Sequence, residues 1–231
     1  MLLDRPRRHA GLVAVQTRNP TVTRLLEAVL AEWQLGTRDP GEAKVVLVER
    51  GLTAPAGVDV IWLTPMPLSK PPYLELPLSL TELYHCLEQF FFPLPRRHIR
   101  MTTVVPVDLN VRSVWLVGRL ISLSDHGARI ACPAILPKGE VLALDFKLDH
   151  FPLRLHGEVL YDIPPGDTEH NKEPQAGLLF KSLDPELRQA LRSYIENCCL
   201  QRACAVTGIS PQDPALSWFE RVDSPWSHLT R

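Results

Sequence analysis

The hydrophobic and polar positions of the first ninety residues alternate between strand-like runs and helical periodicity. Short apolar runs of the kind found in buried strands lie at 11–16 (GLVAVQ), 44–49 (KVVLVE) and 58–63 (VDVIWL). Two other segments carry apolar residues at helical spacing, one that follows Thr21 as the expected N-cap and one over about 79–92. Apolar strands that alternate with helices predict a parallel sheet of α/β type.

After Arg96 the pattern changes to apolar segments of strand length with no helix between them. These six segments lie at 104–107, 114–121, 128–132, 141–146, 153–160 and 175–180. Turn signals such as Asp125-His126-Gly127 separate them, which predicts a small β-barrel, closed or nearly closed. A helix follows, with Asp184 as N-cap and Pro185 at its first position, and we expect it to cover one mouth of the barrel.

These patterns divide the chain into four parts, and the predicted fold class is α/β plus all-β. We expect an α/β domain over 1–92, a linker over 93–103, a six-stranded barrel with its closing helix over 104–204, and a tail over 205–231. The tail contains Trp218, Phe219 and Trp226. These aromatic residues either dock onto the rest of the chain or form a motif that binds a partner.

The charge balance narrows the classes of partner. Lys and Arg number 25 against 26 Asp and Glu, which argues against a broad basic surface for a nucleic-acid polymer. The sequence shows no leader pattern at its N-terminus and no apolar run long enough to span a bilayer. We therefore expect a cytoplasmic protein without a membrane span.

The sequence carries no established catalytic or metal-binding motif. GxSxG, HExxH and phosphate-loop patterns are absent, and the eight histidines are scattered. The five cysteines are an odd number without a CxxC pair, which is typical of buried thiols rather than of disulfides or a zinc site. We expect no enzyme, no cofactor and no metal.

Residues 12–92 resemble the receiver domain of response regulators. The resemblance lies in the opening strand, in "VVLVE" at the place of the phosphoacceptor strand, in "VIWLTP" where the strand ends in Thr or Ser, and in "YLELP" where the family has a Lys-Pro pair. Between Trp33 and Lys44 the chain leaves little room for the usual second strand and helix.

The receiver active site is missing from these positions. Glu49 stands at the phosphoacceptor position, Gln16-Thr17 replace the acidic pair, Leu76 replaces the lysine, and only Thr64 matches. Phosphoryl transfer in a receiver needs clustered carboxylates for a divalent cation and an Asp that attacks phosphate. We expect a degenerate scaffold without phosphorylation, used for packing against a second copy of the chain or against a protein partner.

Two further motifs resemble the signatures of the PilZ family, RxxxR before the barrel and (D/N)xSxxG on its wall. Arg96 and Arg100 match the first signature, and Ser124 and Gly127 match the second, but Ser122 stands where the family has Asp or Asn. The segment "QAGLLFKSLDPELRQALRSYI" resembles the end of the same domain. The resemblance covers about 96–199 and implies binding of cyclic di-GMP.

The chemistry of a cyclic dinucleotide explains these residue types. Forked guanidinium groups suit both phosphates and the O6 and N7 acceptors of guanine, so we expect Arg96 and Arg100 to clasp the ligand, with Arg97 as a further contact. Ser124 is expected either to donate to a ligand oxygen or to accept from the backbone. Gly127 is expected to allow either a positive φ or a close backbone approach.

Four neighbouring positions have lesser expected roles. A hydroxyl at Ser122 reaches less far than a carboxylate, and the loss of a charge-assisted hydrogen bond weakens binding by roughly 1.5–3 kcal/mol. We expect Asp125 and His126 to serve mainly through their turn backbone, and His98 to be an exposed linker residue.

The resemblance implies a bacterial cyclic di-GMP receptor in motility or biofilm regulation. It would act by rearranging its domains, or by exposing a surface for a protein partner, when the linker orders around the ligand. The alternative is a degenerate PilZ adaptor that does not bind nucleotide and acts by protein contact alone. The sequence leaves open the partner, the oligomeric state, and whether one ligand or an intercalated pair is held.

Overall fold

The computed structural model describes residues 12–70, 72–93, 95–166, 172–221 and 225–227. The described chain divides into two compact units, one formed by 12–97 with 196–221 and the other by 98–195 with 225–227. Gly11, the expected first residue of the opening strand, lies outside the described residues, as do the outer ends of the predicted α/β domain and tail. We describe each unit by itself.

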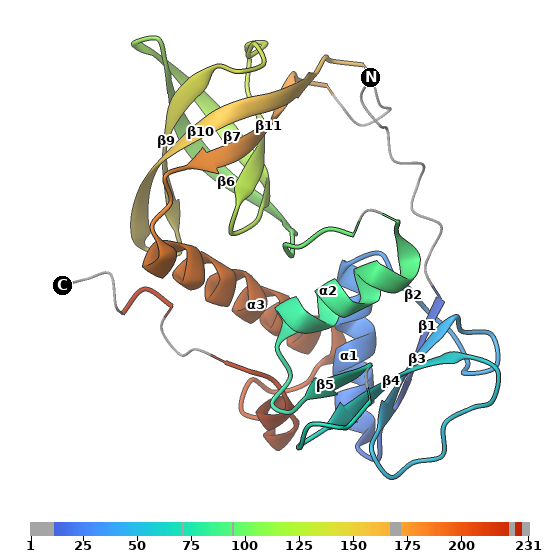
Figure 1. Cartoon of the computed structure of the whole chain (residues 1–231). Coiled ribbons are helices and arrows are strands. Elements are labelled where there is room, and N and C mark those ends of the chain that lie inside the picture. The colour runs from blue at the N-terminus through green and yellow to red at the C-terminus, as the bar shows by residue number, and fades with distance from the viewer. Residues whose placement is uncertain (1–11, 71, 94, 167–171, 222–224, 228–231) are drawn as a thin grey trace. The chain divides into compact units, whose positions relative to one another are not determined.

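The first unit is built on a parallel sheet, as the apolar runs predict. Its strands are β1 (Leu12–Gln16), β2 (Gly36–Thr37), β3 (Val45–Glu49), β4 (Asp59–Thr64) and β5 (Tyr73–Glu75), in the order β2-β1-β3-β4-β5 (Figure 1). This is the strand order of flavodoxin-like folds, the class to which receiver domains belong. The second strand, for which the sequence left little room, is present but is only two residues long.

Two helices of this unit pack against one side of the sheet. Helix α1 spans Pro20–Glu32 and α2 spans Leu80–Phe91 (Figure 1). The ring of Trp33, the C-cap of α1, meets the ring of Tyr84 of α2 edge to face at 5.1 Å. The predicted N-cap of α1, Thr21, is wrong. Asn19 caps the helix because its side chain accepts from the Thr21 amide at 2.9 Å, and Pro20 then occupies the first helical position.

Loops cover the opposite side of the sheet. Every residue between β2 and β4 is described, and none of them is helical. Ala43, Leu52 and Val58 from these loops pack on a small apolar cluster that includes Val46 and Val48 of β3. The unit therefore keeps the strand order of a receiver-like scaffold but covers the second face with loop side chains.

The tail is part of the folded units. A 3₁₀ helix, η1 (Pro214–Trp218), leads into Phe219, which is 3% exposed. The Leu78 amide donates to the Trp218 carbonyl at 2.7 Å, and the Glu220 amide donates to the Leu78 carbonyl at 3.0 Å. Of the two alternatives for these aromatic residues, docking onto the chain itself is therefore the one that the structure shows.

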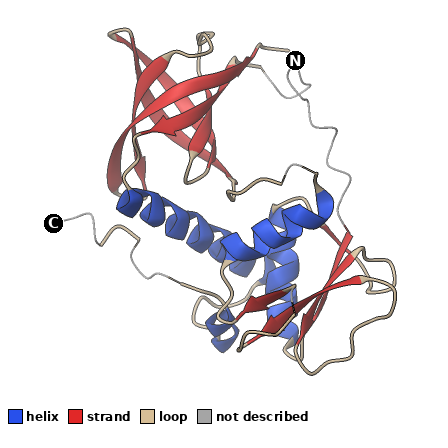
Figure 2. Cartoon of the chain, in the orientation of Figure 1, coloured by secondary structure: helices blue, strands red, loops and turns tan. Residues whose placement is uncertain are grey.

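The second unit is a closed barrel of six antiparallel strands, as predicted (Figures 1 and 2). In sequence order the strands are β6 (Met101–Val111), β7 (Val114–Leu123), β8 (Gly127–Ala131), β9 (Val141–Leu148), β10 (Phe151–Ile163) and β11 (Gln175–Lys181). The predicted linker ends too late, because residues 101–103 already belong to β6 and pair with the end of β7. Within this unit Trp226 stacks on Phe151 at 4.9 Å.

The helix after the barrel continues past residue 204, where the sequence predicted that its domain ends. Helix α3 spans Pro185–Thr207, and its cap is as predicted, since Asp184 accepts from the Glu186 amide at 2.8 Å. Residues 185–195 belong to the barrel unit, whereas from Glu196 onward the helix belongs to the first unit, where Glu196 accepts from the Thr81 amide at 2.7 Å. In the described parts of the chain no helix has both the length and the apolar character needed to cross a membrane.

Candidate functional site

Strand pairing brings parts of both PilZ-type motifs to one corner of the barrel. Thr102 near the start of β6 pairs with Ser122 near the end of β7, and Met101 pairs with Leu123. Arg100 directly precedes Met101 and is exposed. The second arginine of RxxxR therefore lies beside the strand end that carries the SxSxxG residues.

The Ser124 hydroxyl is used inside the protein. Ser124 is 3% exposed, and its Oγ donates to the Gly127 carbonyl at 3.0 Å while it accepts from the Gly127 amide at 3.1 Å. Ser124 was predicted either to donate to a ligand oxygen or to accept from the backbone, and the structure shows the backbone contact. Ser124 holds the β7–β8 turn in shape, and any ligand would meet the turn rather than this hydroxyl.

Gly127 is needed for close packing between strands. A Cβ at this position would lie 2.1 Å from the carbonyl oxygen of Leu178 on β11, and its backbone does not adopt a left-handed φ. Of the two expected reasons for a glycine here, a positive φ or a close backbone approach, the second is therefore correct. The backbone that approaches Gly127 is that of β11 in the same chain.

Asp125 and His98 make side-chain contacts that were not predicted. Asp125 is 3% exposed, its Oδ1 lies 2.9 Å from His98 Nδ1, and its Oδ2 accepts from Arg192 Nη2 of α3 at 2.9 Å. The His98 and His126 rings stack with centroids 3.8 Å apart. His98 is thus half-buried against the barrel rather than exposed, and Asp125 acts through its carboxylate rather than its backbone.

Burial is the main cause of a lowered His98 pKa. It disfavours the charged imidazolium, and repulsion from His126 and Arg192 adds to this effect, whereas the Asp125 carboxylate opposes it. The carboxylate is shared with the Arg192 guanidinium, so it stabilises a second positive charge less well.

The same three side chains are also the candidate metal ligands of the described residues. The ligand atoms of His98, Asp125 and His126 lie within 4.8 Å of one another. However, the two imidazole planes are inclined by only 19° in a stack, so their nitrogen lone pairs do not converge on one point. Arg192 already donates to one oxygen of Asp125. The side chains of His98, Asp125, His126 and Arg192 therefore form a hydrogen-bonded polar cluster, here called the brace, rather than a coordination shell.

Arg96 and Arg97 belong to the first unit. The Arg96 backbone amide donates to Glu88 Oε2 at 2.9 Å, and Arg97 is exposed. The structure therefore assembles Arg100, Ser122, Ser124 and Gly127 in one unit and leaves Arg96 and Arg97 in the other.

Arg129 lies beside the motif residues, although neither motif includes it. It pairs directly with Ser122 across β7 and β8, and its Nε donates to Gln175 Oε1 at 2.7 Å. The signal was present, because residues two apart in a strand share a face and Arg129 follows Gly127 by two. Only the strand register shows that the face is the one that carries Ser122.

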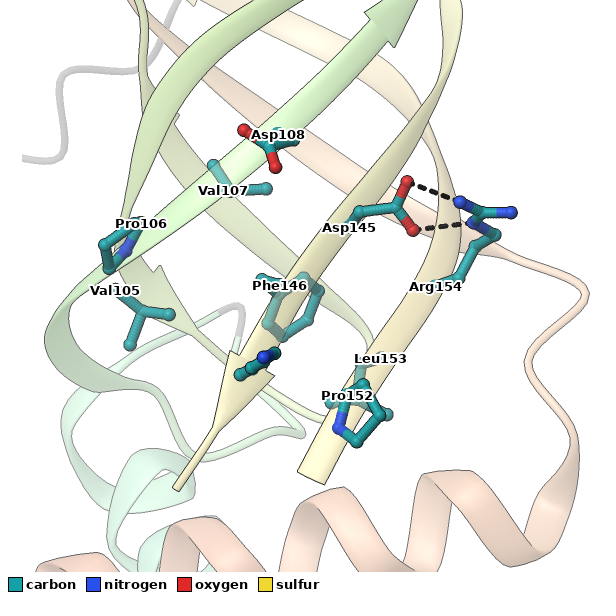
Figure 3. A pocket seen from close by; sticks show the side chains of 10 residues that line it. Val105, Pro106, Val107, Asp108, Asp145, Phe146, Pro152, Leu153 and Arg154 are labelled. Carbon is teal, nitrogen blue, oxygen red and sulfur yellow. Dashed lines mark hydrogen bonds and ion pairs between the residues drawn. The ribbon is translucent and has the colours of Figure 1, made fainter. Parts of the chain in front are cut away.

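Two cavities lie away from these motif residues. One, of about 630 Å³, lies on β6, β9 and β10, and its lining includes Val105, Pro106, Phe146 and the Asp145–Arg154 ion pair (Figure 3). The other, of about 740 Å³, lies in the first unit where β3 and β4 end.

This second cavity occupies the edge at which a receiver would hold its metal and phosphoryl group. Glu49 lies at the end of β3, as predicted, but Arg18 binds it through its backbone amide at 2.7 Å and its guanidinium at 3.1 Å. A cationic side chain thus neutralises the carboxylate, an arrangement that does not favour a divalent cation.

Comparison with known proteins supports part of this interpretation. The PilZ domain family matches residues 95–197. No curated protein matches the chain.

Among solved structures, the Bacillus subtilis inhibitor of motility (MotI/DgrA) is 15% identical with a TM-score of 0.39, over 48% of this chain and 52% of that one. YcgR from Escherichia coli in complex with c-di-GMP is 15% identical with a TM-score of 0.45, over 52% of this chain and 53% of that one. This chain therefore corresponds to about half the length of either protein. The family match and the six-stranded barrel agree in position, and residues 95–197 of this chain are a PilZ domain.

Proposed function

We propose that this chain is a bacterial receptor for cyclic di-GMP. The observation that carries the proposal is the position of Arg100, exposed at the start of β6, next to the strand end that carries Ser122 and the turn shaped by Ser124 and Gly127. A guanidinium in this place can bind a phosphate or the acceptor edge of guanine. Ligand contacts are proposed for Arg96, Arg97, Arg100 and Ser122, with Ser124 and Gly127 shaping the turn beneath.

The division of the motif suggests how binding would be transmitted. Arg96 and Arg97 belong to the first unit and Arg100 to the barrel unit. In this proposal, ordering of the segment from Arg96 to Arg100 around the ligand leads to a rearrangement of the domains. The output, in this proposal, is a changed surface for a protein partner in the control of motility or biofilm formation.

The receiver-like unit has a supporting role in the proposal. Its Glu49 is paired with Arg18, which makes this carboxylate unsuited to the metal-assisted phosphoryl transfer of a receiver. Contact with a second copy of the chain or with the regulated partner is the function that remains for it.

Isothermal titration calorimetry with cyclic di-GMP tests the proposal. We expect wild-type protein to bind and an Arg96→Ala, Arg100→Ala double variant to lose binding. A matched control replaces Arg112 and Arg154 by Ala, two exposed barrel arginines that pair with Glu140 and Asp145. Small-angle scattering with and without ligand then measures whether the overall dimensions change.

The alternative is an adaptor that has lost its nucleotide. Ser122 in place of an acidic or amide side chain favours it, as does the internal use of the Ser124 hydroxyl. No heat with wild-type protein, together with no competition at high ligand concentration, would support the adaptor and refute the receptor.

A further inference from the structure

Three side chains form a continuous row on the outer wall of the barrel, next to the motif corner. Thr102 of β6 pairs with Ser122 of β7, and Ser122 pairs with Arg129 of β8. Directly paired residues of antiparallel strands point to the same face. Their neighbours Leu123 and Ile130 are fully buried in the barrel, so the row faces outward.

This row offers hydrogen-bond donors. A guanidinium has N–H groups and no acceptor, and the hydroxyls of Thr102 and Ser122 can donate. A family member with Asp or Asn at position 122 would present an acceptor there instead. The substitution to Ser therefore leaves a neutral hydroxyl, which can donate as well as accept, opposite the guanidinium of Arg129, which can only donate.

Arg129 differs from the other paired arginines of the barrel unit. Arg112, Arg119, Arg154 and Arg192 each pair with a carboxylate. Arg129 instead donates through Nε to the neutral amide oxygen of Gln175, at 2.7 Å. This bond orients the guanidinium without neutralising its charge, and it leaves the two terminal NH₂ groups outside the contact.

We infer that Arg129 contacts the ligand and that the Thr102–Ser122–Arg129 row selects the acceptor edge of guanine. The inference rests on the proposed binding of cyclic di-GMP. Guanine presents O6 and N7 as acceptors, for which a guanidinium fork is the commonest protein partner, whereas N1–H and N2–H require an acceptor. The guanidinium on this wall therefore binds O6 and N7 of guanine, whereas a carboxylate in its place would bind N1–H and N2–H.

The test combines changes in the protein with changes in single ligand atoms. Calorimetry compares cyclic di-GMP with an analogue whose guanines are 7-deazaguanine, which lacks the N7 acceptor, and with cyclic di-IMP, which lacks the 2-amino donor. For wild-type protein we expect the 7-deaza analogue to bind about ten- to a hundredfold more weakly, the effect of one charge-assisted hydrogen bond. Cyclic di-IMP should bind within about threefold of cyclic di-GMP, because the Arg129 guanidinium has no acceptor for the 2-amino group, and a neutral hydroxyl is a weaker acceptor than a carboxylate.

The Arg129→Gln variant should weaken cyclic di-GMP binding by a similar factor and should distinguish the 7-deaza analogue less strongly than wild type does. Arg129→Lys keeps the charge without the fork and should show an intermediate loss, and it serves as the second variant if Gln at this position disturbs the barrel. Arg154→Gln is the matched control, an exposed barrel arginine whose partner is Asp145, and it should behave as wild type.

The outcomes separate this inference from the proposed function. If wild-type protein binds cyclic di-GMP and Arg129→Gln binds it equally well, or distinguishes the 7-deaza analogue as strongly as wild type does, the role of Arg129 is overturned and the receptor is left intact. A large loss with cyclic di-IMP would show that the wall reads the donor edge, which also overturns it. No wild-type binding to cyclic di-GMP refutes the receptor and the inference together.

Discussion

His98 Nδ1 lies 2.9 Å from Asp125 Oδ1, which joins the middle of the RxxxR segment to the middle of the SxSxxG segment. Both residues occupy positions that the two motifs leave unspecified. Arg192 of α3 binds the other oxygen of Asp125, so one buried carboxylate connects the segment before the barrel, the β7–β8 turn and the helix after it. This connection fixes the segment that immediately precedes Arg100.

The stability of the barrel should depend on pH through His98. Its pKa in the folded state is lowered below the ordinary 6.5, chiefly by burial, so the unfolded chain binds the proton more readily. The contribution of His98 to stability is therefore complete above the ordinary pKa and declines as the pH falls below it toward the folded-state pKa. Urea midpoints measured from neutral pH to about pH 5.5 should fall, across the range in which a histidine titrates.

Two variants test whether His98 causes this dependence of stability on pH. His98→Gln should flatten the dependence on pH, while His156→Gln, at an exposed position on β10, should leave it unchanged. Equal slopes for wild type and His98→Gln would contradict the assignment.

Removal of the Asp125 carboxylate should destabilise the barrel. Asp125→Ala leaves both His98 and Arg192 without their shared acceptor, and we expect a loss of about 1–3 kcal/mol in the free energy of unfolding. The control is Asp145→Ala, whose partner Arg154 is exposed, with an expected loss below about 1 kcal/mol. Chemical denaturation measures both, and equal losses would show that the buried brace contributes no more than a surface pair.

Gly127 should tolerate no side chain. In Gly127→Ala the new Cβ would meet the Leu178 carbonyl, so β8 and β11 must separate, and we expect a loss of about 3 kcal/mol or more, at the upper end of the cost of overpacking. Gly41→Ala is the control, because nothing lies within 4 Å of a Cβ at that position. Thermal unfolding compares the two, and a Gly127→Ala protein as stable as wild type would refute the packing role.

The docked tail should stabilise the first unit. Phe219→Ala removes a buried ring next to Leu78, and we expect it to cost about 3–5 kcal/mol. Val206→Ala, at a position that is 82% exposed, should change the stability by less than about 0.5 kcal/mol. Rapid proteolysis of the tail in wild-type protein at native conditions would argue against stable docking.

The buried thiols should react slowly. Burial raises the pKa of Cys86 to about 11 and that of Cys199 to about 12, so little thiolate is present near neutral pH. Alkylation by iodoacetamide, followed by mass spectrometry, should label these two cysteines slowly in the folded protein and rapidly in urea. Fast labelling of Cys199 without denaturant would mean that its segment of α3 opens readily.

Local patterns in the sequence determined most of the secondary structure. Period-2 and continuous apolar runs located the six barrel strands, and helical spacing located both helices of the first unit, because burial of one face depends on the residues of that element alone. The cap of α3 was correct for the same reason. The cap of α1 was wrong because Asn19 and Thr21 are both good capping residues, and only the backbone at Pro20 decided between them.

The RxxxR and SxSxxG motifs located the corner of the site, but the tertiary structure decided what each side chain does there. Ser124 satisfies its own turn, Gly127 accommodates β11, and Asp125 binds a histidine and an arginine from distant parts of the chain. Arg129 joined the candidate site only through the register of β7 and β8, which contains an irregularity after Leu120. Spacing along one strand cannot give that register, because it is set by hydrogen bonds and packing between strands that are separate in sequence.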